Sequence, residues 1–284
     1  MTSRARARAF AELVRLPAAL TVPGDTLAGA AAAGRLGARS LAMPAASVAL
    51  YWAGMALNDW ADRDLDAVER PERPIPSGRV SPRQALGAAV GLTAAGVGLA
   101  ALAGGRPATA TAAALAGSVW AYDTVLKDTA AGPVAMAAAR GLDVLLGASA
   151  AGRTRAGLVP AGLLAAHTAG VTLLSRGEVR GTRPLTAGLA GGVTVATAAV
   201  AAGHGRAALP VALAAAYAGS VGSAQLAAVS SPDAGTVRRA TGAGIRGMIP
   251  LQAALVARRS PLAAIGLLAA GPIVKAASKV VSPT

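Results

Sequence analysis

Residues 84–122 read QALGAAVGLTAAGVGLAALAGGRPATATAAALAGSVWAY, and Arg106 is the only charged residue among them. A membrane-spanning helix needs about 20 mainly apolar residues. The stretch is therefore long enough for two short spans, joined by a tight, weakly basic turn at Arg106. A second stretch, residues 184–232, has the same character. Both runs predict helices that cross a membrane in pairs.

The chain as a whole has the composition of a polytopic membrane protein. Of its 284 residues, 54% are hydrophobic and 14% are charged, and the mean hydropathy is +0.52. This composition excludes an ordinary water-soluble protein. We expect one integral membrane domain over residues 1–284, an all-α bundle of about nine to ten spans. The predicted segments are 14–34, 41–57, 84–104, 107–124, 132–151, 157–174, 184–203, 207–229, 238–257 and 260–277.

The net charge of +14 would suggest a nucleic-acid partner in a soluble protein. Here the basic residues flank apolar segments, so no nucleic acid is expected and membrane lipid is the surrounding partner. Lys and Arg concentrate on the cytoplasmic side of membrane proteins. A cytoplasmic N-terminus puts most of them inside, including Arg4, Arg6, Arg8 and the 63–83 loop. We predict this orientation in a bacterial-type cytoplasmic membrane.

The acidic residues are few and unevenly placed. Only 13 occur, and six of them lie between Asp59 and Glu72. Carboxylates are costly in hydrocarbon, so a group of them beside an apolar segment suggests a functional site. A solvated anionic loop balanced by its own arginines is the alternative. The predicted topology puts this stretch, and hence the candidate site, at the cytoplasmic face.

The spacing of the acidic residues favours a functional site over a solvated loop. Asn58, Asp59, Asp62 and Asp66 follow the pattern N-D-x-x-D-x-x-x-D, which places the three aspartates along one face of a helix. Oxygen ligands of this kind suit Mg²⁺, which is typically held by one or two carboxylates together with substrate phosphates. The absence of cysteine and the presence of only two histidines also favour oxygen ligands. A row of carboxylates therefore predicts a site for Mg²⁺ and a diphosphate.

Residues 58–81, NDWADRDLDAVERPERPIPSGRVS, resemble the first aspartate-rich motif of the UbiA superfamily of intramembrane prenyltransferases. The resemblance implies a helical bundle of about nine spans around a lipid-accessible cavity, with a prenyl diphosphate bound through Mg²⁺. The segment AYDTVLKD, with Tyr122 and Lys127, is similar to the Y-x-x-x-x-K element of that superfamily. The likeness is greatest to its bacterial branch with EboC-like members.

The second acidic motif of the superfamily is reduced in this chain. Where a D-x-x-x-D element is usual, residues 173–181 read LLSRGEVRG, in which Glu178 is the one acidic residue. Glu178 could still hold a metal, since a glutamate is an adequate oxygen ligand. Asp123, Asp128 or Asp143 could replace the missing carboxylate of this motif, if the fold brings one of them close to the metal site.

Ionisation of an allylic diphosphate develops negative charge on the leaving diphosphate, which metal ions and basic side chains stabilise. The chain is therefore expected to transfer a prenyl group to an unidentified lipophilic or aromatic acceptor. We predict roles for the candidate residues as follows. Catalysis is assigned to Asp59, Asp62 and Lys127; metal binding to Asp59, Asp62, Asp66 and Glu178; substrate binding to Asn58, Arg63, Arg73, Tyr122 and Arg140.

Some alternatives remain open. Arg140 and Asp143 are spaced to form an ion pair within one helix, which competes with a role for Arg140 at the diphosphate. Asp25, in the first segment, is either a substrate contact or a structural cap. The whole protein could instead be a transporter or lipid-handling protein with a cation site, or a prenyl diphosphate binder without catalysis. A transporter commonly has its carboxylates near the membrane midplane, whereas these lie at one face.

Overall fold

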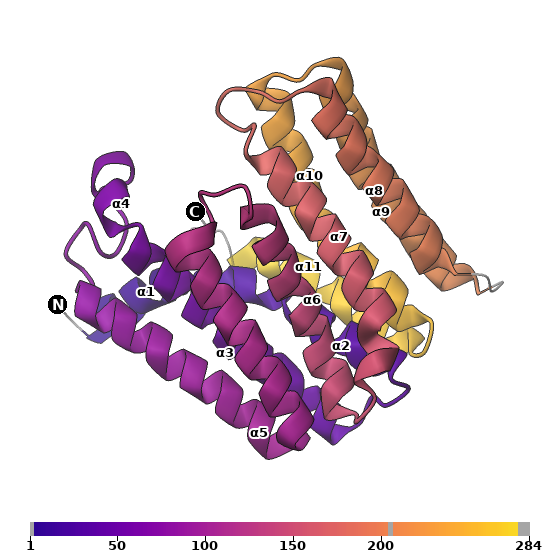
Figure 1. Cartoon of the computed structure of the whole chain (residues 1–284), viewed down its shortest axis with the longest axis horizontal. Coiled ribbons are helices and arrows are strands. Elements are labelled where there is room, and N and C mark those ends of the chain that lie inside the picture. The colour runs from indigo at the N-terminus through magenta and orange to yellow at the C-terminus, as the bar shows by residue number, and fades with distance from the viewer. Residues whose placement is uncertain (1–2, 204–206, 278–284) are drawn as a thin grey trace.

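The computed structural model describes residues 3–203 and 207–277 of the chain, and every element in these ranges is helical, as expected (Figure 1). The elements are α1 (Ser3–Leu13), η1 (Leu16–Thr21), α2 (Pro23–Ala32), α3 (Ala38–Ala61), α4 (Arg63–Glu69), α5 (Pro82–Ala121), η2 (Tyr122–Leu126), α6 (Gly132–Ala150), η3 (Thr154–Gly157), α7 (Leu158–Ser175), α8 (Pro184–Ala202), α9 (Ala208–Ser230), α10 (Ala234–Ala257) and α11 (Pro261–Ala277). From residue 132 onward, the longer helices coincide closely with the predicted apolar segments.

The element α5 is two helices joined at a sharp break. Gly105 has φ 65° and ψ −163°, a conformation outside the helical region that glycine adopts without a Cβ penalty. Trp120 donates a hydrogen bond from Nε1 to Oγ1 of Thr93 at 3.1 Å. A straight helix would separate these residues by about 40 Å. The chain therefore folds back at Gly105, and the predicted pair of segments with a tight turn is confirmed.

The first predicted segment, 14–34, is not one continuous helix. It consists of a short 3₁₀ helix, η1, followed by the ten-residue α2. Arg15, just before η1, has φ 47° and is the one non-glycine residue with positive φ in the described ranges. Pro17 and Pro23 supply the physical reason for the break, because proline lacks a backbone N–H and fits only the first turn of a helix. The segment thus holds two short helices that meet the rest of the bundle separately.

Glycines let α2 and α6 approach at backbone distance. A Cβ at Gly29 would overlap the carbonyl oxygen of Val144, and one at Gly147 would overlap the carbonyl oxygen of Thr26. Membrane helices pack mainly through such close van der Waals contact, since lipid tails offer no hydrophobic driving force between helices. This close packing of α2 on α6 places Asp25 of α2 in the interior of the bundle, with none of its surface exposed.

Gly147→Ala is expected to destabilise the protein by about 1–3 kcal/mol, because the added methyl group must push α2 away from α6. The matched control is Gly87→Ala on α5, where a Cβ meets nothing within 4 Å. Alanine favours a helix over glycine by up to about 1 kcal/mol, so the control should be neutral or slightly stabilising. Thermal unfolding in detergent measures both. Equal shifts in the two variants would contradict the close packing of α2 on α6.

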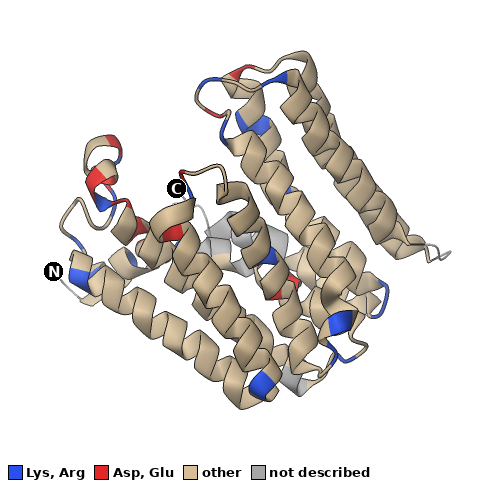
Figure 2. Cartoon of the chain, viewed as in Figure 1, with Lys and Arg blue, Asp and Glu red and all other residues tan. Residues whose placement is uncertain are grey.

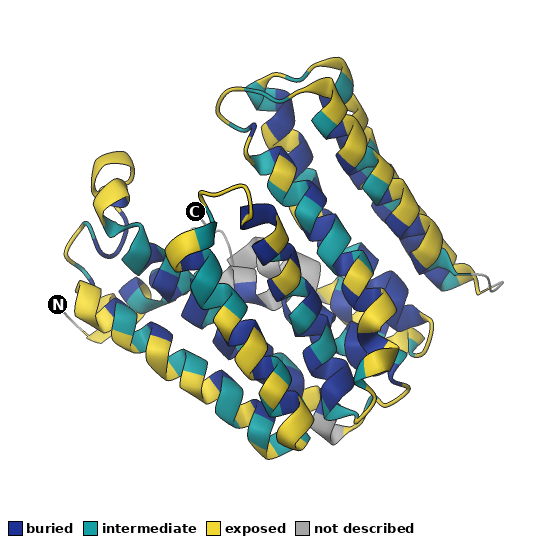
Figure 3. Ribbon diagram, in the orientation of Figure 1, coloured by how far each residue is buried: buried dark blue, intermediate teal, exposed yellow. Residues whose placement is uncertain are grey.

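The outer surface is apolar in the way that a bilayer requires. In the described part of the chain, five helices are long and apolar enough to cross a membrane, one of them being α5 together with η2, which turns back on itself. Large apolar residues of α8 and α9 are exposed, and Figure 3 shows exposed positions along both helices. Leu185 is 72% exposed and Leu226 is 66% exposed. Apolar patches of this extent mark a membrane-facing surface, so the chain has the character of an integral membrane protein.

Candidate functional site

Two helix ends bring the first group of polar side chains together. Asn58 lies near the end of α3, Asp62 directly follows this helix, and Asp123 lies in η2, at the end of α5. The Nδ2 atom of Asn58 donates to Oδ2 of Asp62 at 3.2 Å and to Oδ1 of Asp123 at 3.4 Å. Lys127 is paired with the other oxygen of Asp62. Asn58, Asp62, Asp123 and Lys127 are called the carboxylate cluster below.

A second group lies beside the cluster and contains arginines. Arg15 Nη2 is 3.0 Å from Oδ1 of Asp59, and Arg73 Nη1 is 3.4 Å from the same oxygen. The same nitrogen of Arg73 is 2.6 Å from Oδ2 of Asp66. Arg70 also lies 3.8 Å from Asp66. Asp59 and Asp66 are therefore neutralised by guanidinium groups of the chain itself.

The single row of three aspartates that the spacing predicts is divided in the structure. The helix α3 ends at Ala61, and Asp62 has φ −87° and ψ 3°, outside the helical range. Asp59 and Asp66 bind Arg73, whereas Asp62 binds Lys127. Like charges close together repel, and basic side chains offset this repulsion: Arg73 lies between Asp59 and Asp66, and Lys127 binds Asp62. Figure 2 shows acidic residues gathered on α4 and the adjoining helix ends.

Arg63 and Glu178 do not join the cluster, whereas Tyr122 lies next to its carboxylates Asp62 and Asp123. Arg63 turns away from it, because its Nη1 donates to the carbonyl of Trp60 at 2.9 Å and its guanidinium stacks 5.1 Å from the Trp60 ring centre. Glu178 lies in the loop after α7, where its carbonyl accepts from Arg238 at 2.7 Å and ties that loop to α10. Tyr122 begins η2 and accepts a backbone hydrogen bond from Lys127 at 3.0 Å.

Arg140 lies inside the bundle, and its partner is Asp25 on α2. Asp25 also accepts a hydrogen bond from Nε2 of Gln252 at 2.8 Å. The ion pair expected between Arg140 and Asp143 is replaced by this contact, and Asp143 accepts from Oγ of Ser47 at 2.7 Å. The reason is the close packing of α2 on α6, which offers Arg140 a carboxylate on another helix. Asp25 does not cap α2, whose N-cap is Val22 without a side-chain hydrogen bond; its partner is Arg140 on α6.

The sequence interpretation missed Arg15 and did not assign Asp123 to the site. Arg15 is separated from Asp59 by 44 positions, and no acidic pattern surrounds it in the sequence. Its positive φ is an outlier of the kind that accompanies functional sites. Asp123 directly follows Tyr122 in the AYDTVLKD segment, a signal that could have identified it. In the structure Asp123 is only 4% exposed and lies next to Asn58.

The carboxylate and amide oxygens of the carboxylate cluster are of the ligand type that Mg²⁺ prefers. Asp62 and Asp123 provide two carboxylates on either side of one amide. Mg²⁺ commonly takes one or two carboxylates and completes its six ligands with water and substrate phosphate. Within residues 3–203 and 207–277, no three His, Cys, Asp or Glu side chains converge as a complete protein cage for a metal would require. The donor set therefore suits a metal that is shared with a phosphate ligand.

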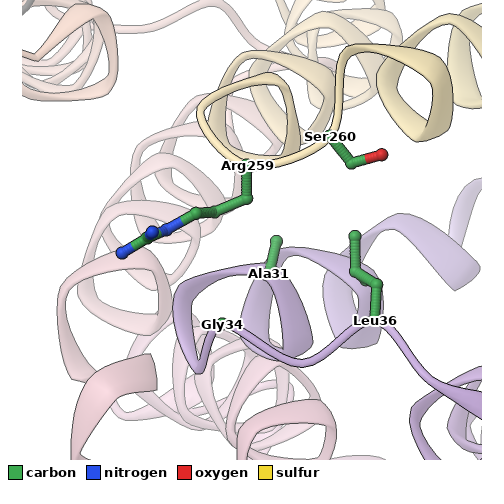
Figure 4. A pocket seen from close by; sticks show the side chains of 5 residues that line it. All are labelled: Ala31, Gly34, Leu36, Arg259 and Ser260. Carbon is green, nitrogen blue, oxygen red and sulfur yellow. The ribbon is translucent and has the colours of Figure 1, made fainter.

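One cavity among the described residues borders this site, and another lies apart from it. A cavity of about 370 Å³ lies between α1 and residues 72–79, with Asp59 in its wall. Another, of about 420 Å³, lies where the end of α2 meets the junction of α10 and α11, beside Arg259 and Ser260 (Figure 4). Arg259 is the one charged residue in the wall of the latter cavity. The first cavity is the one that the site chemistry can use.

The sequence of the chain matches a known protein family and several of its curated members. Residues 21–241 match the UbiA prenyltransferase family. A digeranylgeranylglyceryl phosphate synthase of Methanopyrus kandleri is 44% identical over 98 residues, and that of Halobacterium salinarum is 39% identical over 168 residues. These matches cover 33% and 57% of this chain. The chain spans only 35% and 59% of the length of these two curated relatives.

Two solved structures share the fold. A structure described as giving structural and mechanistic insights into digeranylgeranylglyceryl phosphate synthase in membranes superposes with a TM-score of 0.69 at 16% identity, over 88% of this chain and 97% of the other. A UbiA homologue from Archaeoglobus fulgidus bound to GPP and Mg²⁺ gives a TM-score of 0.59 at 13% identity, over 83% and 99%. At this identity the likeness concerns the fold. Since the family match extends over well more than half of its residues, the chain belongs to the UbiA prenyltransferase family.

Proposed function

We propose that the protein transfers a prenyl group from an allylic prenyl diphosphate to an acceptor in the membrane, and that the reaction depends on Mg²⁺. The carboxylate cluster is the observation that carries the proposal. It combines two carboxylates, an amide and a lysine at one end of an apolar bundle. Membership of a prenyltransferase family and the fold shared with a homologue bound to GPP and Mg²⁺ support it.

The proposed mechanism assigns a task to each group. Asp62 and Asp123 would hold Mg²⁺, which neutralises charge on the diphosphate when bound. Lys127 stabilises the same diphosphate oxygens as the bond between the prenyl carbon and its oxygen breaks and the electron pair passes to the diphosphate. Arg15 and Arg73 contribute positive charge beside Asp59. The apolar helices around the site exclude water, which suppresses hydrolysis of the allylic cation.

The acceptor proposed here is a glyceryl phosphate that carries a free hydroxyl group. Its oxygen would form the new bond to the prenyl carbon and release its proton. The proposal draws on the curated relatives, which are synthases of digeranylgeranylglyceryl phosphate. The assignment to an EboC-like branch stays a prediction.

The membrane placement proposed is a cytoplasmic N-terminus, a site at the cytoplasmic face and nine to ten spans. The Arg-rich α1 and the polar 63–81 stretch support it, because they lie at the same end of the bundle as the carboxylate cluster (Figure 2). Basic residues are typical of the cytoplasmic side.

The experiment that tests the proposal uses purified protein in nanodiscs, with geranyl or geranylgeranyl diphosphate and an alkylglycerol phosphate. Product formation with Mg²⁺, and its loss on addition of EDTA with recovery by excess Mg²⁺, is the expected result. Binding of the diphosphate without turnover would favour the non-catalytic binder. Failure of folded protein to bind either diphosphate with Mg²⁺ would contradict the proposal and make cation transport the next activity to assay.

A further inference from the structure

The cavity of about 370 Å³ beside Asp59 has features that prenyl diphosphate binding at the carboxylate cluster does not use. Its wall includes Arg8 and Glu12 of α1, and Glu72 and Arg79 of the following loop. Asp62, Asp123 and Lys127 do not contribute to this wall. Asp59, with Arg15 and Arg73, forms its inner side. The cavity is thus a separate compartment that shares one side with the candidate active site.

Positive charge exceeds negative charge along the wall. Four arginines face three carboxylates there, and all seven belong to the part of the chain that the structure describes; they are Arg8, Arg15, Arg73, Arg79, Glu12, Asp59 and Glu72. Asp66, which also binds Arg73, has Arg70 as a second partner at 3.8 Å. An excess of guanidinium groups in a confined space is typical of a site for a phosphate, whose oxygens accept several N–H donors.

Glu12 lies in the wall of the cavity and holds two of these arginines, of which Arg8, with its side chain 71% exposed, lies at the mouth. Nε of Arg8 lies 3.1 Å from Oε1 of Glu12, and Arg79 is paired with Oε2. Burial raises the pKa of Glu12, but the hydrogen bonds from Arg79 and Arg8 outweigh burial and leave the pKa below its usual value. Glu12 is therefore ionised at neutral pH. An anionic ligand entering the cavity would compete with this carboxylate for Arg8 and Arg79.

The inner arginines are well shielded from solvent. The side chain of Arg15 is 17% exposed and that of Arg73 is 10% exposed. Electrostatic attraction is stronger where water is excluded. At the outer end, α1 buries Ala9 and Leu13 against the bundle while Arg4 and Arg6 remain exposed. Such an amphipathic basic helix suits the membrane–water boundary, where the head group of a lipid-like ligand would enter.

We propose that this cavity is a second anion site, which binds the phosphate group of the acceptor and orients its hydroxyl toward the prenyl diphosphate at the carboxylate cluster. The volume of about 370 Å³ is several times that of a water molecule in the liquid, about 30 Å³, and accommodates a glyceryl phosphate head group. The inference rests on the proposed function for the identity of the ligand. The group that would be recognised, an anionic terminal phosphate, is also present in free phosphate and in released pyrophosphate.

The test measures binding of a single-chain alkylglycerol phosphate to the full chain in nanodiscs of neutral phosphatidylcholine. Arg8→Gln should weaken binding about threefold to tenfold, since it removes a donor at the mouth. Glu12→Gln should tighten binding by a similar factor, because it removes the competing carboxylate and releases Arg8 and Arg79. A merely destabilised protein would not bind more tightly, so the second variant keeps the test independent of folding.

The controls separate the cavity from general surface charge. Arg4→Gln, on the exposed side of the same helix, should leave the affinity unchanged. The uncharged alkylglycerol of the same chain length should bind at least about tenfold more weakly than its phosphate. An equal loss with Arg4→Gln, or no tightening with Glu12→Gln, would overturn the proposal. Inorganic phosphate or pyrophosphate binding as tightly as the alkylglycerol phosphate would equally overturn the assignment to the acceptor.

Failure of this inference and failure of the proposed function give different results. Mg²⁺-dependent binding of geranylgeranyl diphosphate is measured in the same preparations, and it should be unchanged in Arg8→Gln and Glu12→Gln. Retained diphosphate binding with unaltered alkylglycerol phosphate binding in both variants contradicts the second anion site alone. Loss of diphosphate binding in the unmodified protein contradicts the proposed function, whatever the alkylglycerol phosphate does.

Discussion

Asp62→Asn is expected to weaken Mg²⁺-dependent binding of a prenyl diphosphate at least about 100-fold. Asp62 belongs to the carboxylate cluster, where its two oxygens contact Asn58 and Lys127. An amide carries no negative charge and is a poorer ligand for Mg²⁺, and even indirect partners of a metal ligand commonly contribute 10- to 100-fold to metal affinity. A 100-fold loss corresponds to about 2.8 kcal/mol. Titration of geranylgeranyl diphosphate into nanodisc-bound protein, with and without Mg²⁺, measures it.

Asp64→Asn is the matched control for this variant. Asp64 lies two residues away, its side chain is 87% exposed, and its ion pair is to Arg63 at 3.4 Å. The same loss of charge at this position should leave binding within about twofold, since exposed ion pairs contribute little. If folded Asp62→Asn protein bound the prenyl diphosphate as tightly as the unmodified protein, Asp62 would not belong to the proposed site. Equal losses in both variants would indicate an effect of loop charge alone.

Arg140→Met is expected to destabilise the folded protein by about 3–5 kcal/mol, because it leaves the carboxylate of Asp25 without its ionic partner inside the bundle. Asp25 has no exposed surface, and its remaining side-chain neighbours among the described residues would be Gln252 and the carboxyl group of Asp143. A buried ionised carboxylate without compensation is strongly unfavourable. Unfolding of the purified protein in mixed detergent and SDS micelles gives the change in the free energy of unfolding.

The double variant Asp25→Leu/Arg140→Met should recover most of the lost stability, since apolar replacement of both partners of a buried pair is often neutral. Arg155→Met, at an exposed position of η3, is the control for loss of a surface arginine and should change stability by less than about 0.5 kcal/mol. A stable Arg140→Met protein with defective prenyl transfer would contradict the structural role. It would favour the substrate-binding role that the sequence predicts for Arg140.

Local sequence was sufficient for most of the helical architecture. The apolar segments that became α7, α8 and α9 carry almost no charge over the length of a span, and length and composition set approximately where such helices begin and end. The same holds for the turn at Gly105, where the chain folds back. The break between η1 and α2 was harder to predict, because an apolar run does not show how its prolines divide it.

Local sequence predicted only part of the candidate site. The spacing of Asn58, Asp59 and Asp62 is a local signal and drew attention to the end of α3, where Asn58 and Asp62 of the carboxylate cluster lie. Spacing could not show that α3 ends at Ala61, nor that Asp59 would be bound by Arg15 and Arg73 while Asp62 binds Lys127. These pairings depend on which cations the fold brings near.

The sequence by itself therefore determined the membrane class, the helical segments and the stretch that carries the acids, because hydropathy and helical period act over neighbouring residues. The tertiary structure alone decided that Asp123 rather than Glu178 joins Asn58, and that Arg140 pairs with Asp25 across 115 positions. Contacts between distant positions follow from how closely the helices pack. At Gly29 and Gly147 the missing Cβ atoms permit that approach, and only the assembled bundle reveals which side chains it brings into contact.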